Sequence, residues 1–248
     1  MTGTKDATVT KVPAALWREW LWRGTTLFDR LLAPLDAEDL RAPSLLPGWS
    51  RAHVAAHVGY NAQALERLLT WARTGVEQRM YPDSAARDRE IAAGARLDAA
   101  ALRDLVATSG ARLADAIRTM PPGHWQDVEV ITARGRTVPA VEVLWLRVRE
   151  VWVHAVDLDR GMPFDSFPAP LLDALMTDLL DGRRRSGRQP ALVLQPLDRA
   201  RTWQVPIDGQ RPVTLSGSTA ALFAALSGRS SRDITHDGGP ELDLGRWL

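Results

Sequence analysis

The chain has 248 residues, 45% of them hydrophobic and 25% charged, with a formal net charge of +1. These values are typical of a globular protein with a substantial core, and they give no reason to expect binding to nucleic acid or to an anionic membrane. Cysteine is absent, which excludes disulfides, thiolate metal ligands and a nucleophilic thiol supplied by the protein itself.

No stretch reaches the roughly 20 apolar residues of a membrane-spanning helix, and residues 1–6 lack the apolar region of a signal peptide. We therefore expect a cytoplasmic protein with no membrane partner. Nearly all of the positive charge is carried by arginine. The guanidinium group of arginine binds carboxylates in a bidentate manner. A GC-rich genome is nevertheless the favoured explanation for the high arginine content.

The first 160 residues are predicted to be mainly helical, because apolar residues recur there at helical spacing. In chain order, long helices are expected over residues 9–35, 51–74, 98–120 and 139–160, and a shorter helix over residues 83–93. Ser50 and Asp98 are typical N-cap residues, and Gly75 is a typical C-terminal stop. The long helices and the lengths of their connections predict a four-helix bundle with inserted segments.

One inserted segment is a β-hairpin. Apolar and polar residues alternate over residues 128–138, around the turn Arg134-Gly135-Arg136. Pro139 follows directly and is expected in the first turn of the last long helix, where a proline is tolerated.

The pattern changes after Gly161. In chain order, we expect a helix over residues 170–182, short strands over residues 191–197, 202–207 and 212–216, and a helix that Ser218 caps and Leu226 ends. The prediction is therefore an α+β protein of two domains: a four-helix bundle over residues 1–160 and a smaller α+β domain over residues 161–248.

Two pairs of side chains with i, i+4 spacing are suited to metal binding. Glu150 and His154 form one pair, and His53 and His57 form the other. Residues four apart lie on one face of a helix, with Cβ atoms roughly 5–6 Å apart, so each pair can direct its ligands at one divalent ion. Two histidines and a glutamate with an open fourth position are typical of catalytic zinc sites. Spacing alone does not decide between His53 and His57 as the third ligand.

Each of these residues also has a structural interpretation. A single histidine on an apolar helix face is more often a hydrogen-bonded core residue than a ligand. Glu150 could face solvent or pair with Arg147 or Arg149 in a helical salt bridge, but it lies among apolar residues, where an unpaired buried carboxylate is costly. The metal interpretation is therefore favoured, whereas His124, in a loop, and His236, in a glycine-rich tail, are weak candidates.

The segment Gly48-Trp49-Ser50-Arg51-Ala52-His53-Val54-Ala55-Ala56-His57 resembles the DinB-like family of metal-binding four-helix bundles. In that family the first histidine ligand follows the tryptophan by eight residues, which corresponds to His57 here. The helix with Glu150 and His154 resembles the part that carries the other ligands. Within the family the likeness is closest to the mycothiol-dependent maleylpyruvate isomerases, through residues 57–62, 134–139, 149–158, 216–229 and 246–248.

The resemblance implies a metal-binding bundle followed by an α+β domain related to sterol-carrier-type folds, with the active site between them. It implies zinc bound by His57, Glu150 and His154. It also implies that Arg229, in a Gly-Arg turn after the last helix, leans over the metal and binds a substrate carboxylate.

The reaction implied by the resemblance is the cis–trans isomerisation of maleylpyruvate to fumarylpyruvate. Zinc would hold the sulfur of the cofactor mycothiol as a thiolate, which adds to the double bond, allows rotation and is then eliminated. Arg229 would bind substrate and cofactor, with help from Arg149, although Arg149 and Arg134 are more simply explained as surface or salt-bridge residues. His53 or Tyr60 would be the proton donor.

Two other functions fit the same residues. One is a mycothiol S-transferase that uses the zinc thiolate on another electrophile. The other is a non-catalytic small-molecule-binding module in which the metal has a structural role. In the favoured interpretation the protein is a monomer whose partners are mycothiol and a small-molecule substrate.

Overall fold

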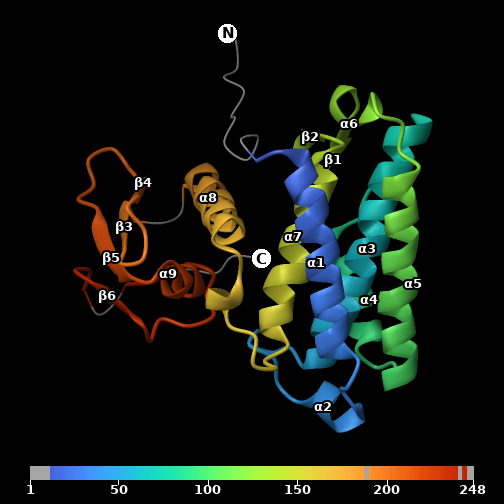
Figure 1. Ribbon diagram of the computed structural model, residues 1–248, viewed down its shortest axis with the longest axis horizontal. Helices are drawn as coiled ribbons and strands as arrows, with labels where there is room; N and C mark the ends of the chain where they lie inside the picture. Colours follow the sequence, from blue (N-terminus) through green and yellow to red (C-terminus); the bar gives the residue numbers. More distant parts are fainter. Residues whose placement is uncertain (1–11, 188–189, 240–241, 245–248) are drawn as a thin grey trace. The chain divides into compact units, whose positions relative to one another are not determined.

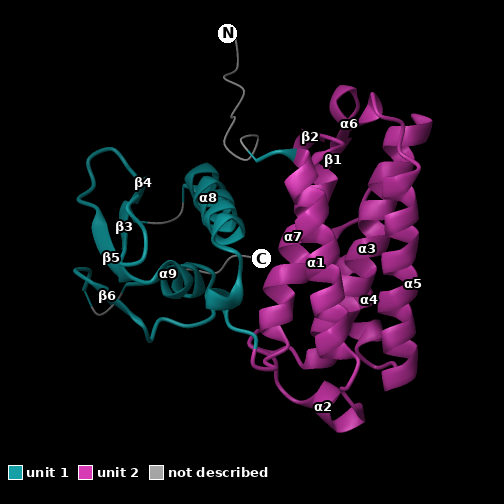
Figure 2. Cartoon of the chain, in the orientation of Figure 1, with its two compact units in different colours: residues 1–13, 162–248 teal, residues 14–161 magenta. Residues whose placement is uncertain are grey.

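The described chain forms two compact units (Figure 2). The computed structural model describes residues 12–187, 190–239 and 242–244. One unit comprises residues 14–161 and is mainly helical, and the other, which comprises residues 1–13 and 162–248, contains a four-stranded sheet. The protein is therefore of the α+β class, as predicted. None of its described helices combines the length and the apolar character needed to cross a membrane.

Four long helices make up most of the helical unit (Figure 1), namely α1 (Ala14–Leu32), α3 (Arg51–Thr74), α5 (Ala99–Arg118) and α7 (Glu142–Asp157). Helix α3 packs against both α5 and α7, and α1 packs against α7. The connections contain α2 (Ala37–Arg41), α4 (Ser84–Gly94), α6 (His124–Asp127) and the antiparallel pair β1 (Glu129–Ile131) and β2 (Thr137–Pro139). Because α3 and α7 are neighbours, the two predicted ligand pairs lie on helices that contact each other.

The capping residues expected from the sequence define the ends of two helices. Ser50 is the N-cap of α3, and Gly75 ends that helix in the left-handed conformation, with φ of 76°. Asp98 caps α5 by accepting a hydrogen bond of 2.8 Å from the N–H of Ala101. Caps depend on a few adjacent residues, so both helices are confirmed to within about two residues of their predicted ends.

The helical unit differs from the prediction in its first helix, in the turn after it and at Pro139. Helix α1 begins at Ala14, and residues 9–11 of its expected range lie outside the described residues. The expected turn after it contains α2, which Asp36 caps by accepting hydrogen bonds from the N–H groups two and three residues further on. Pro139 does not belong to α7: it is the last residue of β2, paired with Glu129, and α7 begins three residues later. A proline without an N–H is suited to the end of a strand.

The second unit contains α8 (Ala169–Ser186), β3 (Leu192–Pro196), β4 (Trp203–Val205), β5 (Val213–Gly217), α9 (Thr219–Leu226) and β6 (Ile234–His236). The strand order is β4-β3-β5-β6, with β3 and β5 parallel and the outer pairs antiparallel. Helix α9 connects β5 to β6 and is capped by Ser218, as predicted. The strand β6 was not predicted, because its glycine-rich surroundings resemble a mobile tail.

Helices α1 and α7 approach each other closely at Gly24. A Cβ atom there would lie 2.4 Å from Nε1 of Trp152, which already donates a hydrogen bond of 2.8 Å to the carbonyl of Trp20. We expect Gly24→Ala to lower the free energy of unfolding by about 1–3 kcal/mol, measured by urea denaturation. In the control Gly110→Ala, no atom lies within 4 Å of the added Cβ, so stability should rise by about 0.5–1 kcal/mol. Equal effects of the two substitutions would contradict the close approach of α1 and α7.

Candidate metal centre

The helical unit brings three predicted ligands together. His57 on α3 and the pair Glu150 and His154 on α7 offer ligand atoms that all lie within 4.8 Å of one another. The Nε2 atoms of His57 and His154 lie 2.8 Å and 3.2 Å from the same carboxylate oxygen, Oε2 of Glu150. The two imidazole rings meet edge to face, with centroids 4.8 Å apart. Two nitrogens and one carboxylate oxygen that converge in this way are suited to a single small cation.

The three converging side chains are buried, which supports their interpretation as metal ligands. The three residues are only 5%, 7% and 2% exposed for His57, Glu150 and His154. Nδ1 of His57 is buried and makes no hydrogen bond, and the buried Nε2 of His154 has Oε2 of Glu150, 3.2 Å away, as its polar neighbour. Two imidazole nitrogens and a carboxylate oxygen buried this close together are costly unless a proton or a cation lies between them, and a divalent cation would bind all three atoms. The residues present therefore fit a metal ion.

Asp157 orients one of the candidate ligands. It is fully buried, and Nδ1–H of His154 donates to its Oδ2 at 2.8 Å. A hydrogen bond at Nδ1 directs the Nε2 lone pair of a histidine towards a metal, an arrangement common around zinc. This role was not predicted from the sequence, although the i, i+3 spacing from His154 to Asp157 was a visible signal.

The electrostatics separate the roles of the two histidines. Burial lowers the pKa of His57 to about 4, against the opposing effect of Glu150. Burial also acts to lower the pKa of His154, but the hydrogen bond to Asp157 and the proximity of Glu150 outweigh it and raise that pKa. Burial alone would raise the pKa of Glu150, yet the two imidazoles hold it well below its usual range. Glu150 is therefore an anion, and a cation that binds beside it must displace any proton held by His154.

His53, the alternative third ligand, lies one turn before His57 and has a different set of partners. The backbone N–H of Ser50 donates to Nδ1 of His53 at 3.2 Å, and the Ser50 hydroxyl lies 2.8 Å from the same nitrogen. The His53 ring also stacks on Trp49, with centroids 6.2 Å apart. Desolvation lowers the pKa of His53, so its side chain is neutral and caps the start of α3.

Two other predicted site residues lie on the ligand helices. Arg149 is next to Glu150, and its Nη2 lies 4.0 Å from Oε1 of that carboxylate. Tyr60 lies on α3 and packs towards α4, because a Cβ atom at Gly94 would be 2.7 Å from Cε2 of its ring. The structure thus places Arg149 beside the three converging ligands and Tyr60 in the contact between α3 and α4.

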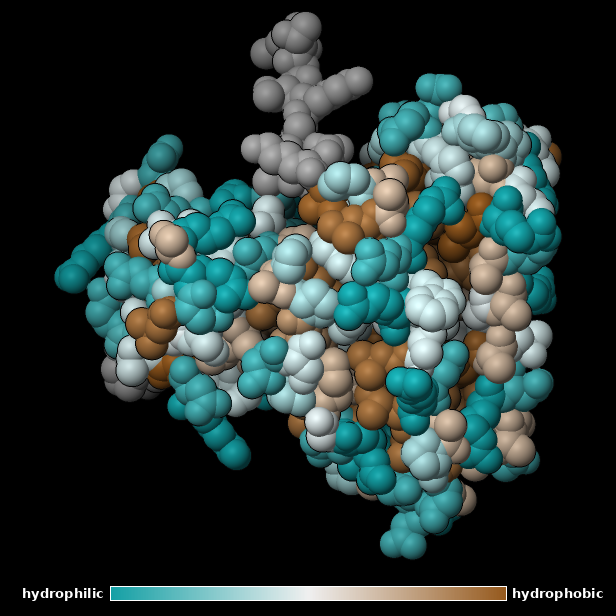
Figure 3. All heavy atoms as spheres, viewed as in Figure 1, coloured by the Kyte–Doolittle hydropathy of each residue, from teal (hydrophilic) through white to brown (hydrophobic). Residues whose placement is uncertain are grey.

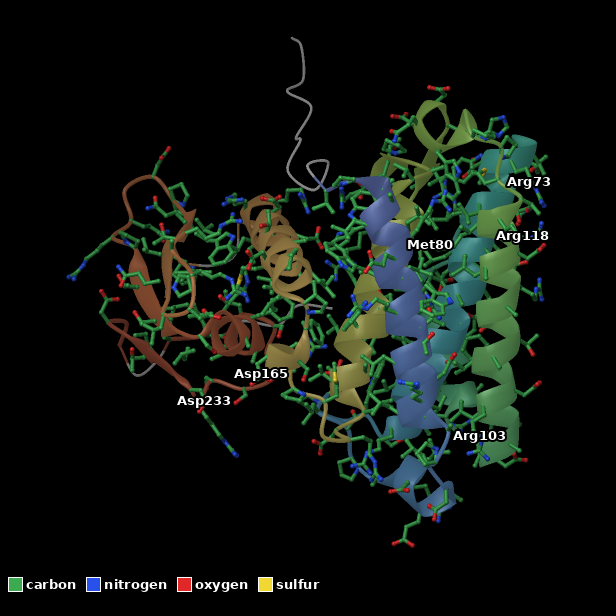
Figure 4. The ribbon with its side chains drawn as sticks, in the orientation of Figure 1. Arg73, Met80, Arg103, Arg118, Asp165 and Asp233 are labelled. Carbon is green, nitrogen blue, oxygen red and sulfur yellow. The ribbon has the colours of Figure 1, made fainter. Side chains whose placement is uncertain are left out.

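A further tyrosine, Tyr81, was not predicted as a site residue. Burial and the charge of Glu150 raise its pKa to about 12. It follows Met80, labelled in Figure 4, whose carbonyl accepts from the guanidinium of Arg67 and whose sulfur accepts from the N–H of Ala133 at 3.1 Å. Tyr81 lies in the irregular connection between α3 and α4. No periodic pattern in the sequence indicates that the charge of Glu150 affects the pKa of a residue there.

Arg229 belongs to the second unit, just after α9. Gly228 adopts the left-handed conformation with φ of 78°, and the N–H of Arg229 donates to the carbonyl of Ala224 at 2.9 Å. Nη1 of Arg229 donates to the carbonyl of Ser227 at 2.7 Å. Local contacts thus hold the predicted Gly-Arg turn. Residues 246–248, which contributed to the resemblance, lie outside the described residues.

A family model for the mycothiol maleylpyruvate isomerase N-terminal domain matches residues 21–159. The chain belongs to the mycothiol maleylpyruvate isomerase family. Two solved structures are also similar to it, the crystal structure of the mycothiol-dependent maleylpyruvate isomerase and that of a histidine-to-alanine mutant. Each has a TM-score of 0.89 and 38% sequence identity, and each match covers 100% of both chains. The comparison with curated proteins gave no match.

The isomerase family match includes the candidate metal centre, because His57, Glu150 and His154 all lie within the matched residues 21–159. The similarity to the solved isomerase extends over the second unit as well, which contains Arg229. The family predicted from the sequence is therefore confirmed, and with it the assignment of the chain to a mycothiol-dependent class of isomerases.

Proposed function

We propose that this protein is a zinc- and mycothiol-dependent isomerase that converts maleylpyruvate to fumarylpyruvate. The observation that carries the proposal is the convergence of His57, Glu150 and His154 in a chain of the mycothiol maleylpyruvate isomerase family. The chain contains no cysteine, so the reacting thiol must be that of a cofactor. The proposal includes a DinB-like bundle, a second domain related to sterol-carrier-type folds, and a monomer in the cytoplasm.

The three candidate ligands would hold the metal, with Asp157 fixing the His154 ring through the 2.8 Å hydrogen bond. A bound divalent ion would keep the sulfur of mycothiol deprotonated near neutral pH, so that it can add to the double bond and leave after rotation. The anionic Glu150 would partly neutralise the charge of the ion, and the two imidazoles would complete the set of protein ligands.

The other proposed roles are binding and proton transfer. Arg229 would bind a substrate carboxylate and orient the double bond. Arg149, 4.0 Å from Oε1 of Glu150, would contact the cofactor at the edge of the metal centre. His53 or Tyr60 would donate a proton to the enolate that thiolate addition forms and take it back before the thiolate leaves.

We expect the purified protein to contain about one zinc ion per chain and to consume maleylpyruvate only when mycothiol is present. Metal content is measured by atomic emission, and turnover by following the absorbance of substrate and product with and without the thiol. A protein without bound metal would contradict the zinc enzyme and support the binding module. Metal binding without mycothiol-dependent turnover of maleylpyruvate would instead favour the mycothiol S-transferase, which is tested with electrophiles such as monobromobimane.

A further inference from the structure

Arg147 is a buried arginine between the two helices that carry the candidate ligands. It is only 2% exposed. Its Nη1 donates two hydrogen bonds to α3, one of 2.7 Å to the carbonyl of Val58 and one of 3.1 Å to Oδ1 of Asn61. A single guanidinium nitrogen on α7 therefore binds α3 at two points that are one turn apart.

The two bonds lie beside the metal ligands along both helices. Val58 follows His57 directly, and Asn61 is one turn further on. On α7, Arg147 is one turn before Glu150. Because each ligand is attached to its own helix, the register and separation of α3 and α7 set the distance between His57 and Glu150. Arg147 fixes that register at the level of the ligands.

The charge of Arg147 makes its position unusual. Burial lowers its pKa to about 10, and the charges of Glu150, Asp29 and Tyr81 oppose this effect. Among the described residues, no acidic group lies within ion-pair distance of its guanidinium. Arginines are rarely buried without a paired charge, because removal from water costs several kcal/mol.

The guanidinium also lines a cavity of about 290 Å³ whose walls come from α1, α5 and α7. Asp29 and Phe28 of α1 and Val106 of α5 contribute to the walls, and Figure 3 shows hydrophobic residues between α1 and α5 on this face. The cavity has room for water.

We propose that Arg147 is a positioning residue for the metal centre: the two hydrogen bonds from its Nη1 to Val58 and Asn61 hold His57 at the distance from Glu150 that a metal requires. This inference rests on the proposed function only in requiring that the wild-type protein binds a divalent metal. If Arg147 acted only through its charge, it would weaken metal binding, because a positive charge repels a bound cation. Removal of the charge would then tighten it.

The test compares the zinc affinities of Arg147→Met and Arg147→Lys with that of the wild type, by competition with a chromophoric chelator. Methionine keeps much of the volume but has no donor, and lysine keeps the charge but its Nζ ends one bond short of the position of Nη1, from which both hydrogen bonds are made. We expect both variants to bind zinc about 10–100-fold more weakly and to show altered d–d absorption bands when loaded with Co²⁺. An affinity that rises in the methionine variant and is unchanged in the lysine variant would overturn the proposal.

Two further variants separate positioning from general stability. Leu102→Ala in α5 removes a fully buried side chain, lowers stability by about 2–5 kcal/mol, and should leave zinc affinity and the Co²⁺ spectrum unchanged. Asn61→Ala removes one of the two acceptors and should weaken zinc binding less than Arg147→Met does. If Arg147→Met does not fold, the zinc affinity of Asn61→Ala tests the proposal in its place. Equal loss of affinity in Leu102→Ala and the Arg147 variants would show that Arg147 acts only through stability. Absence of zinc from the wild-type protein would refute the proposed function instead.

Discussion

The His57→Ala variant is expected to lose its metal ion and its isomerase activity, whereas His53→Ala is expected to keep its metal. His57 contributes one of two imidazoles that converge on Oε2 of Glu150. Without it, a divalent ion would have two protein ligands, too few for a stable zinc site. Because loss of a residue that only supports a ligand typically weakens metal affinity about 10–100-fold, loss of the ligand itself should exceed that range.

The measurements are metal content after dialysis and zinc affinity by chelator competition for both variants. His53→Ala is a close control, because it removes a histidine from the same helix one turn away. It also removes the acceptor for the Ser50 N–H, so a loss of stability of about 0.5–2 kcal/mol is expected without loss of metal. Glu150→Ala should behave like His57→Ala. Metal retained at the wild-type level in His57→Ala would show that the third ligand is another residue.

The Arg229→Ala variant is expected to keep its metal and to lose activity. The proposed role of Arg229 is to bind a substrate carboxylate, which contributes to catalysis through orientation of the double bond. Loss of one preorganised charged donor typically costs about 10²–10³-fold in rate, so kcat/KM with maleylpyruvate should fall by that amount. Steady-state kinetics at saturating mycothiol measure the effect, and metal analysis shows that the metal remains.

Two comparisons make this prediction specific. Arg232→Ala removes an exposed arginine three residues further on and should have near-wild-type kinetics. Arg229→Lys keeps the charge but not the bidentate fork, and its activity should lie between those of the wild type and Arg229→Ala. Wild-type kcat/KM in Arg229→Ala would remove this residue from the proposed site, and concurrent loss of metal would show that the variant has a wider structural defect.

Most of the fold was predictable because its signals are local. Helix α3 ends where Ser50 and Gly75 predicted, and Ser218 caps α9 as expected. The errors arose where pairing with a distant segment decides the structure. Pro139 has the sequence character of a helix start, but its pairing with Glu129 makes it the end of a strand. The strand β6 likewise exists through its pairing with β5, which no local pattern indicates.

Less of the candidate site than of the fold could be predicted from the sequence. The pair Glu150 and His154 could be found from spacing, because the helical repeat places residues four apart on one face. His57 was preferred to His53 through the family resemblance, not through spacing. The roles of Tyr81 and Arg147 were not predicted, because Tyr81 is in an irregular connection and Arg147 has the spacing of an ordinary helical salt-bridge partner.

By itself, the amino-acid sequence determined the α+β class, the caps of α3, α5 and α9, the absence of a protein thiol and the two candidate ligands that share α7. These follow from composition and from contacts between residues a few positions apart, which the helical repeat fixes. Only the tertiary structure decided that His57 meets Glu150 at 2.8 Å and that Arg147 joins the same two helices beside them. Those contacts link residues about 90 positions apart, and they depend on how α3 and α7 pack, which no local spacing specifies.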